Sequence, residues 1–152
     1  MQPMKISPLQ LEHYFVSDLH FSANRSFDPA KEPELTNDQF AVEAVSMRDK
    51  EKPAKWQITL RIKHQPAVNT NAPYSFALEV VGFFEVAPAF PQDRTERLVK
   101  TNGATMLYGI AREMVRDLTS RGPHPGLMLP SVSFFEAQPK PQPPANAAPQ
   151  AN

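Results

Sequence analysis

The sequence predicts an α+β domain in which a four-stranded antiparallel sheet carries a long C-terminal helix on one face. Two observations lead to this expectation. Four segments within the first 86 residues alternate apolar and polar side chains, as half-buried strands do. A later segment repeats its apolar residues every three or four positions, as an amphipathic helix does. Strands followed by a helix are typical of α+β folds, and 152 residues suit a single domain.

The first two strands are expected at 9–21 and 39–48. Strict alternation in the first strand divides its side chains between two faces, with Leu9, Leu11, His13 and Phe15 on one and Tyr14, Val16 and Asp18 on the other. The same period puts His13 and His20 on opposite faces, which argues against a metal-binding pair. Between the strands, the proline-rich segment 24–36 is expected to be a loop that carries one aromatic residue, Phe27.

The third and fourth strands are expected at 55–64 and 74–86, each after a turn. In the third strand the apolar side chains share one face, and these are Trp56, Ile58, Leu60 and Ile62. The fourth strand is different, because Ala77, Val81 and Phe83 make its second face apolar too. A strand that is apolar on both faces needs cover on both. The helix supplies one cover, and a second copy of the chain is expected to supply the other.

The helix is expected to end just before Gly122, because Pro123 and Pro125 prevent its continuation. A short helical turn is expected earlier, at 94–99. One face of the long helix gathers its apolar residues, which are Leu107, Ile110, Ala111, Met114 and Leu118. The next segment, 127–135, is rich in large apolar groups on a backbone that proline keeps irregular. A core, a partner subunit or a ligand has to cover it.

Composition excludes several classes of function. Sixteen acids balance sixteen bases, so the chain lacks the basic excess of a nucleic-acid-binding protein. It has no cysteine for disulfides or thiolate zinc sites, which fits a cytoplasmic location. Apolar runs are too short for insertion in a membrane, and the N-terminus does not read as a secretory signal. Residues 1–136 are expected to form the domain, and the proline-rich residues 137–152 a disordered tail.

The sequence also argues against an enzyme. It contains no glycine-rich phosphate loop, no GxSxG and no HExxH, so neither a cofactor nor a catalytic metal is expected. Hydrolysis through His64 or His124 has no supporting motif. The alternative from the residues alone is an oligomeric α+β module that binds one folded partner or a small ligand.

The C-terminal third contains a specific series of motifs: Tyr108-Gly109-Ile110-Ala111-Arg112-Glu113, then Ser120-Arg121-Gly122, then Pro125-x-Leu127-x-Leu129 and Val132-x-Phe134. In these motifs and their spacing the chain resembles the SecB family of protein-export chaperones. Asp18-Leu19-His20-Phe21 and the run 76–80 add weaker support. The resemblance covers about residues 8–136, and its order of strands agrees with the order expected above.

The resemblance implies a homotetramer, built as a dimer of dimers that stack through their helices. It implies an ATP-independent holdase that binds unfolded precursor proteins in the cytoplasm and delivers them to the translocase ATPase SecA. The expected client groove comprises Phe21, Phe27, Phe83, Tyr108, Leu127, Leu129 and Phe134. Asp18 and Glu79 are the expected SecA-docking residues, on the outer sheet face. Residues expected to pack in the oligomer are Leu107, Ile110, Met114 and Leu118.

This chain departs from the family pattern at the docking face. SecB proteins are commonly acidic and this chain is neutral, and Ser22 and Ala77 replace an acid and a leucine of the family. The family's short C-terminal helix is replaced by the proline-rich tail. A SecB-like chaperone dedicated to one client, such as the antitoxin of a toxin–antitoxin pair, is therefore an alternative.

Overall fold

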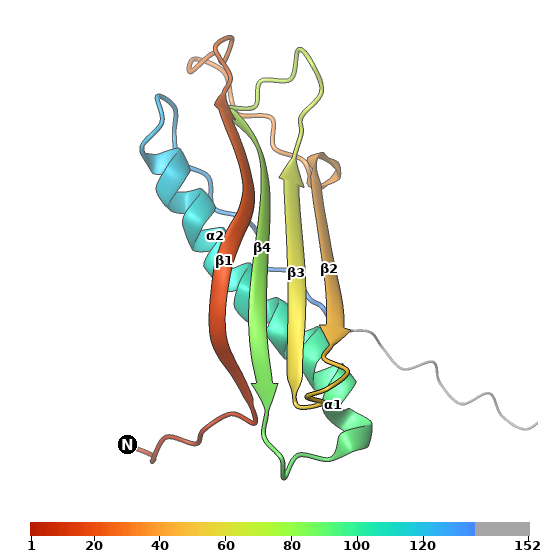
Figure 1. Cartoon of the computed structure of the whole chain (residues 1–152). Coiled ribbons are helices and arrows are strands. Elements are labelled where there is room, and N and C mark those ends of the chain that lie inside the picture. The colour runs from red at the N-terminus through yellow and green to blue at the C-terminus, as the bar shows by residue number, and fades with distance from the viewer. Residues whose placement is uncertain (136–152) are drawn as a thin grey trace, which may run out of the picture.

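A computed structural model describes residues 1–135 of the chain. Its sheet consists of β1 (Leu9–Ala23), β2 (Phe40–Arg48), β3 (Lys55–His64) and β4 (Tyr74–Val86). All neighbours are antiparallel, in the order β1-β4-β3-β2, so β1 and β2 form the two edges (Figure 1). The predicted α+β class and the four-stranded antiparallel sheet are confirmed, and β3 and β4 have the predicted bounds. The predicted tail, 137–152, lies outside the described residues.

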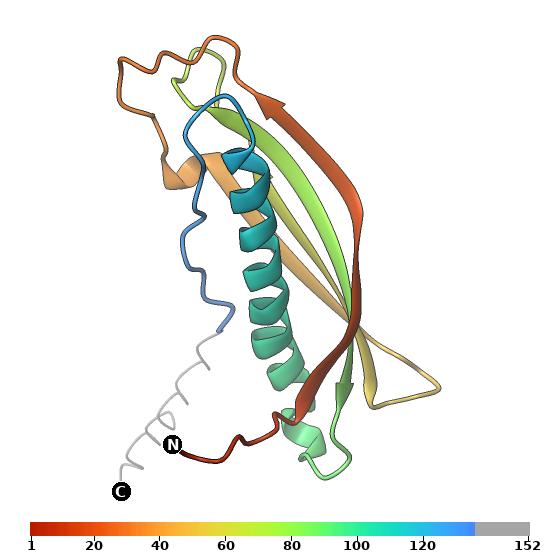
Figure 2. The same ribbon diagram turned by 90° about the vertical axis from the view of Figure 1, so that its left-hand side faces the viewer.

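The helices follow the sheet. They are α1 (Gln92–Leu98), a π-helical turn at Val99–Gly103 and α2 (Ala104–Ser120), with a short 3-10 turn at Asn37–Gln39 before β2. Figure 2 shows α2 and the segment after it on one face of the sheet, while no helix of residues 1–135 covers the other face. We call the first the inner face and the second the outer face. No helix in residues 1–135 is both long and apolar enough to cross a membrane.

The core lies between α2 and the inner face of β3 and β4. Alternate residues of these strands are buried there, including Ile58, Leu60, Val80 and Phe84. α2 approaches closely because Gly82 has no side chain, and a Cβ at that position would lie 2.6 Å from a methyl carbon of Leu107. The buried face of α2 comprises Ala104, Leu107, Tyr108, Ala111, Val115 and Thr119. It is turned slightly from the predicted face, because Ile110, Met114 and Leu118 are only half-buried.

Two β-bulges in β1 correct the predicted faces of that strand. The pairing with β4 shifts by one residue between Leu11 and His13, and again between Val16 and Asp18. Each bulge adds an unpaired residue and reverses the alternation. His13 and Phe15 therefore share the outer face with Asp18 and His20, because they pair with outward-facing residues of β4. The prediction that His13 and His20 lie on opposite faces was wrong for this reason.

The segment after α2 turns back and runs along the helix on the inner side (Figure 2). The Tyr74 hydroxyl fixes the turn: the carbonyl oxygens of His124 and Thr119, at 2.6 and 3.0 Å, share its single proton, and its oxygen accepts from the His124 N–H. A Cβ on Gly122 would lie 2.5 Å from that hydroxyl. Gly122 therefore makes room for Tyr74; its φ is not positive.

Candidate interaction surfaces

The outer face of the sheet carries an apolar belt, by which we mean His13, Phe15, Val45, Met47, Val81 and Phe83. Strand pairing aligns these residues of β1, β4 and β2 in two adjacent rows, in which β3 contributes the polar residues Gln57 and Thr59. The rings of His13, Phe15 and Phe83 form a triangle with centroids 6.1–6.2 Å apart. Phe15 and Met47 are exposed. Apolar rows on a sheet face that residues 1–135 leave uncovered are a feature of interaction surfaces.

Charged rows border the belt on both sides. On one side Arg61 bridges Glu79 on β4 and Glu43 on β2. The Ser17 hydroxyl donates to Glu79, and with Arg61 it lowers the pKa of that carboxyl. On the other side Lys55 pairs with Glu12 and Glu85, and the Lys55 ammonium lowers the pKa of Glu12. Because acids outnumber bases in both rows, the belt has a net negative border.

The two residues expected to dock SecA are direct neighbours. Asp18 and Glu79 are paired across β1 and β4 on the outer face. Their electrostatic surroundings differ, however. Glu79 is held by Arg61, whereas the Asp18 carboxylate is largely exposed and lies 3.3 Å from the His20 ring. Asp18 is therefore the more accessible acid of the pair.

A second apolar surface lies on the inner face of the edge strand. Tyr14, Val16, Leu19 and Phe21 pair with inward-facing residues of β4, yet they are 36–43% exposed. We call these four residues the inner β1 row. Their exposure follows from their position at the edge, because β1 pairs with β4 only. Sequence reasoning selected Phe21 from this row and missed the others, since the bulges that align them leave no signal in the apolar pattern.

The predicted groove residues fall into two groups. Phe21, Phe83 and Phe134 are at least partly exposed. The other four are covered by their own chain, and they are Phe27, Tyr108, Leu127 and Leu129. Phe27 packs 4.7 Å from the His124 ring, and the Tyr108 hydroxyl donates to the carbonyl of Pro130. The covered residues would reach a client only if the segment after α2 moved, so their role in a groove stays a prediction.

The residues predicted to pack in an oligomer are also divided. Leu107 is fully buried against Gly82 in the core of its own protomer, so its side chain is closed to another subunit. Ile110, Met114 and Leu118 lie on a half-exposed flank of α2. Sequence reasoning did not select Gly109 on the same helix. A Cβ there would have no atom within 4 Å, so the protomer itself gives no reason for a glycine.

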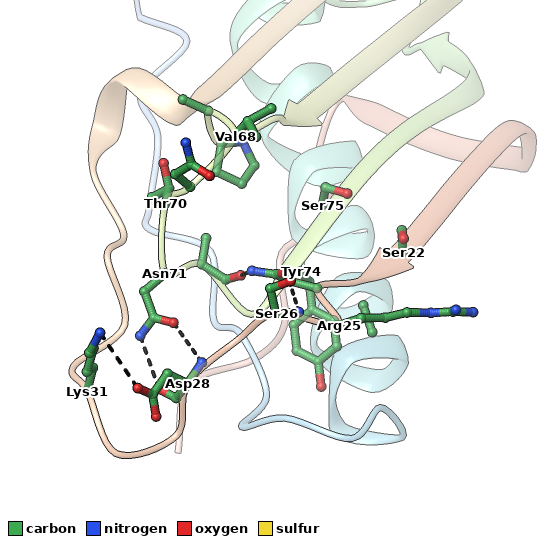
Figure 3. Close-up of a pocket in the computed structure, with 16 residues that line it drawn as sticks. Ser22, Arg25, Ser26, Asp28, Lys31, Val68, Thr70, Asn71, Tyr74 and Ser75 are labelled. Carbon is green, nitrogen blue, oxygen red and sulfur yellow. Dashed lines mark hydrogen bonds and ion pairs between the residues drawn. The ribbon is translucent and has the colours of Figure 1, made fainter.

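A polar pocket of about 510 Å³ lies between the loop after β1 and the turn before β4 (Figure 3). Asn71 holds its walls together: its amide donates to the carbonyls of Asp28 and Glu32 and accepts from the Asp28 N–H. Lys31 lies 3.8 Å from the Asp28 carboxylate. Because these groups satisfy one another, the pocket is best explained as loop structure. Residues 1–135 contain no cluster of three His, Cys, Asp or Glu that could hold a metal ion.

Comparison with known proteins identifies the family. Residues 2–138 match the sequence model of SecB, described as preprotein translocase subunit SecB. A protein-export protein SecB from Bradyrhizobium sp. is 29% identical over 123 residues, 79% of this chain and 73% of the relative. One from Rhodopseudomonas palustris is 27% identical over 137 residues, 87% of this chain and 84% of the relative.

The fold has a counterpart among solved structures. A SecB-like chaperone of Mycobacterium tuberculosis, solved in complex with a ChAD peptide from an antitoxin, superposes with a TM-score of 0.61 at 19% identity. The match covers 82% of this chain and 91% of that chain. Together, the match of the family over nearly all described residues and the shared fold show that this chain belongs to the SecB family of protein-export chaperones.

Proposed function

We propose that the protein is a holdase: it binds unfolded preproteins through exposed apolar surface and needs no nucleotide. The observation that carries this proposal is that one protomer presents the apolar belt on the outer face of its sheet. A protein that binds the unfolded state slows folding and aggregation by mass action. SecB proteins are chaperones and are not known as enzymes, which agrees with the lack of a catalytic motif.

Suppression of aggregation tests this proposal. Several unrelated unfolded proteins should aggregate more slowly with the purified chain, and Phe15→Ser should weaken protection. Val68→Ser is the matched control, because Val68 is exposed on a loop outside both surfaces. Protection of none of the clients would refute a general holdase. Protection of one client alone would instead favour a dedicated chaperone.

We further propose that two protomers pair along β1 and that two such dimers stack through α2. β1 is a 15-residue edge strand, and the inner β1 row is exposed beside it. Unpaired edges and apolar rows of this kind are normally covered in a stable protein. Gly109, together with the flank of Ile110 and Met114, would allow close approach of a second helix. Light scattering should give the mass of a tetramer, and a monomer would refute the assembly.

Delivery to SecA would use the acidic outer face. Since Arg61 already neutralises Glu79, we expect Asp18→Arg to weaken binding to SecA more than Glu79→Arg does. Glu32→Arg, on the loop after β1, is the control for a change of net charge. Calorimetric titration with SecA measures the affinities. Equal affinity for the native protein and the Asp18→Arg variant would rule out docking at this position.

A further inference from the structure

A cavity of about 560 Å³ lies at the opposite end of the sheet from the polar pocket. α1, the π-helical turn and the end of the described chain surround it. Three apolar side chains line it, and these are Phe90, Leu98 and Phe135. Phe90 and Leu98 are half-buried and pack against the core, whereas Phe135 is 56% exposed and can be contacted from solvent. The cavity therefore has a half-buried apolar base and one aromatic side chain that is accessible to solvent.

Arg94 and Arg97 also line this cavity. They are three residues apart on α1, so their side chains lie on the same side of the helix. The Arg97 guanidinium carbon lies 4.9 Å from the centre of the Phe135 ring, a cation–π arrangement that holds it over the cavity. One acid, Asp93, is present among the lining residues, so the charge of the lining is positive.

Within residues 1–135 neither guanidinium has an acidic partner, which among the cations of the helices is otherwise true only of Arg112. Lys100, Arg116 and Arg121 each pair with an acid one turn away, at 2.7, 2.9 and 3.3 Å. Asp93 and Arg97 have the same favourable spacing, yet the structure records no ion pair between them or between Arg94 and any residue in 1–135. No acid within residues 1–135 therefore occupies either arginine, and both can contact an anionic ligand.

We propose that this cavity binds a polypeptide segment of a partner in which a carboxylate stands next to a large apolar side chain. The carboxylate would bridge Arg94 and Arg97, since planar guanidiniums suit carboxylates well. The apolar side chain would lie on Phe90, Leu98 and Phe135. Charge argues that the site is separate from the client surfaces, because the apolar belt has a negative border and this cavity a positive one. The site thus goes beyond the holdase function.

Three fluorescein-labelled decapeptides test the proposal by anisotropy. The first has a central glutamate–phenylalanine pair, the second replaces the glutamate by glutamine, and the third replaces the phenylalanine by serine. The full-length protein should bind the first at least about tenfold more tightly than the others, a difference that corresponds to roughly 1.4 kcal/mol. Equal binding of the glutamate and glutamine peptides would overturn the proposal.

Two sets of variants locate the site. Arg94→Gln combined with Arg97→Gln should reduce affinity for the glutamate peptide about tenfold or more, whereas Arg116→Gln on α2 should leave it unchanged. Equal losses of affinity in the double variant and in Arg116→Gln would indicate non-specific electrostatic attraction. That result would contradict binding of the peptide at this cavity. Trp56 fluorescence in urea verifies that each variant is folded. The double variant should still protect unfolded clients, so the cavity and the holdase function can fail independently.

The chain's own next residue is a rival ligand, because Glu136 directly follows Phe135 in the sequence. Replacement by glutamine separates the two cases. If the cavity serves a partner, Glu136→Gln leaves the affinity for the glutamate peptide unchanged. An affinity that rises about tenfold or more would show that the chain fills its own cavity, and the proposal of a partner segment would be wrong.

Discussion

At the scale of single residues, Tyr74 joins three parts of the chain. Its hydroxyl ties the start of β4 to the end of α2 and to His124. The His124 Nε2–H in turn donates to the carbonyl of Asn24, and its ring packs against Phe27. The loop after β1 is thus linked to the turn after α2. This explains why Phe27 is buried in a loop that the sequence describes only as proline-rich.

Replacement of Tyr74 by phenylalanine tests this link. The variant leaves the carbonyl of His124 and the N–H of the same residue without their partner, so we expect a loss of about 1–3 kcal/mol in the free energy of unfolding. Urea titration followed by Trp56 fluorescence measures it. Tyr14→Phe, at an exposed position of β1, should change stability little. Similar values for the two variants would contradict the role given to the Tyr74 hydroxyl.

His64 is a second residue whose position the sequence did not reveal. Its side chain is 0% exposed and stacks on Phe40 at 4.2 Å, and neither ring nitrogen has a hydrogen-bond partner among the described residues. Burial lowers the pKa of this imidazole, while the nearby Gln39 backbone opposes the shift. Alternation in strand 55–64 puts His64 on the same face as Trp56 and Ile62. It does not indicate how deeply the imidazole ring is buried.

The lowered pKa predicts sensitivity to acid. Below about pH 6.5 the unfolded chain binds a proton at His64 that the folded chain does not, so stability falls as pH falls below that value. In His64→Leu this contribution should vanish, and the stability at pH 5.5 should approach that at pH 7.5. His20→Gln, at an exposed histidine, serves as the control. Parallel pH profiles of the native protein and His64→Leu would contradict the prediction.

At the scale of elements, α2 has three surfaces that differ in what they contact. One packs on the sheet, one contacts the returning segment through Tyr108 and Arg112, and one bears Gly109. The sequence predicted the helix, its end and its apolar character. The sequence could not show that Leu107 and Ile110 belong to different surfaces of the helix. Helical periodicity groups residues three or four positions apart on one apolar face and does not show which of them face the sheet.

Gly109→Ala separates the stability of the helix from the assembly of subunits. Alanine favours a helix interior over glycine by about 1 kcal/mol, and the protomer has space for the added methyl group. The isolated protomer should therefore gain stability. If α2 packs closely against α2 of another subunit, the same methyl group should weaken the tetramer. Analytical ultracentrifugation gives the dissociation constant; an unchanged constant would place the helix interface elsewhere.

At the scale of the whole molecule, the sequence predicted the number, order and class of elements. Turn residues such as Asn69, which adopts a φ of 75°, marked where strands end. The candidate surfaces were predicted less well. Asp18 and Glu79 lie on the outer face, and their role in docking stays a prediction, whereas the inner β1 row and the apolar belt depend on strand pairing and bulges. Such features arise from contacts between distant segments, which local patterns do not record.

If the proposed pairing along β1 is right, folding and assembly are coupled. The midpoint of thermal unfolding should then rise with protein concentration. Leu19→Lys should abolish this dependence, because it places a charge in the inner β1 row. Phe15→Lys is a matched control on the same strand, with similar exposure but on the outer face. Loss of the dependence in both variants, or in neither, would argue against this interface.

The bulges of β1 have a consequence for how relatives of this chain are compared. β1 has 15 residues and its partner β4 has 13, so the two unpaired residues account for the difference. The first bulge reverses the parity of the strand and the second restores it. A homologue of the same length that lacked only one of them would have Asp18 or Leu19 on the other side of its sheet, although an alignment would show no gap in this strand. In this strand, a residue's equivalent in another protein is therefore defined by its partner on β4 rather than by its position in an alignment.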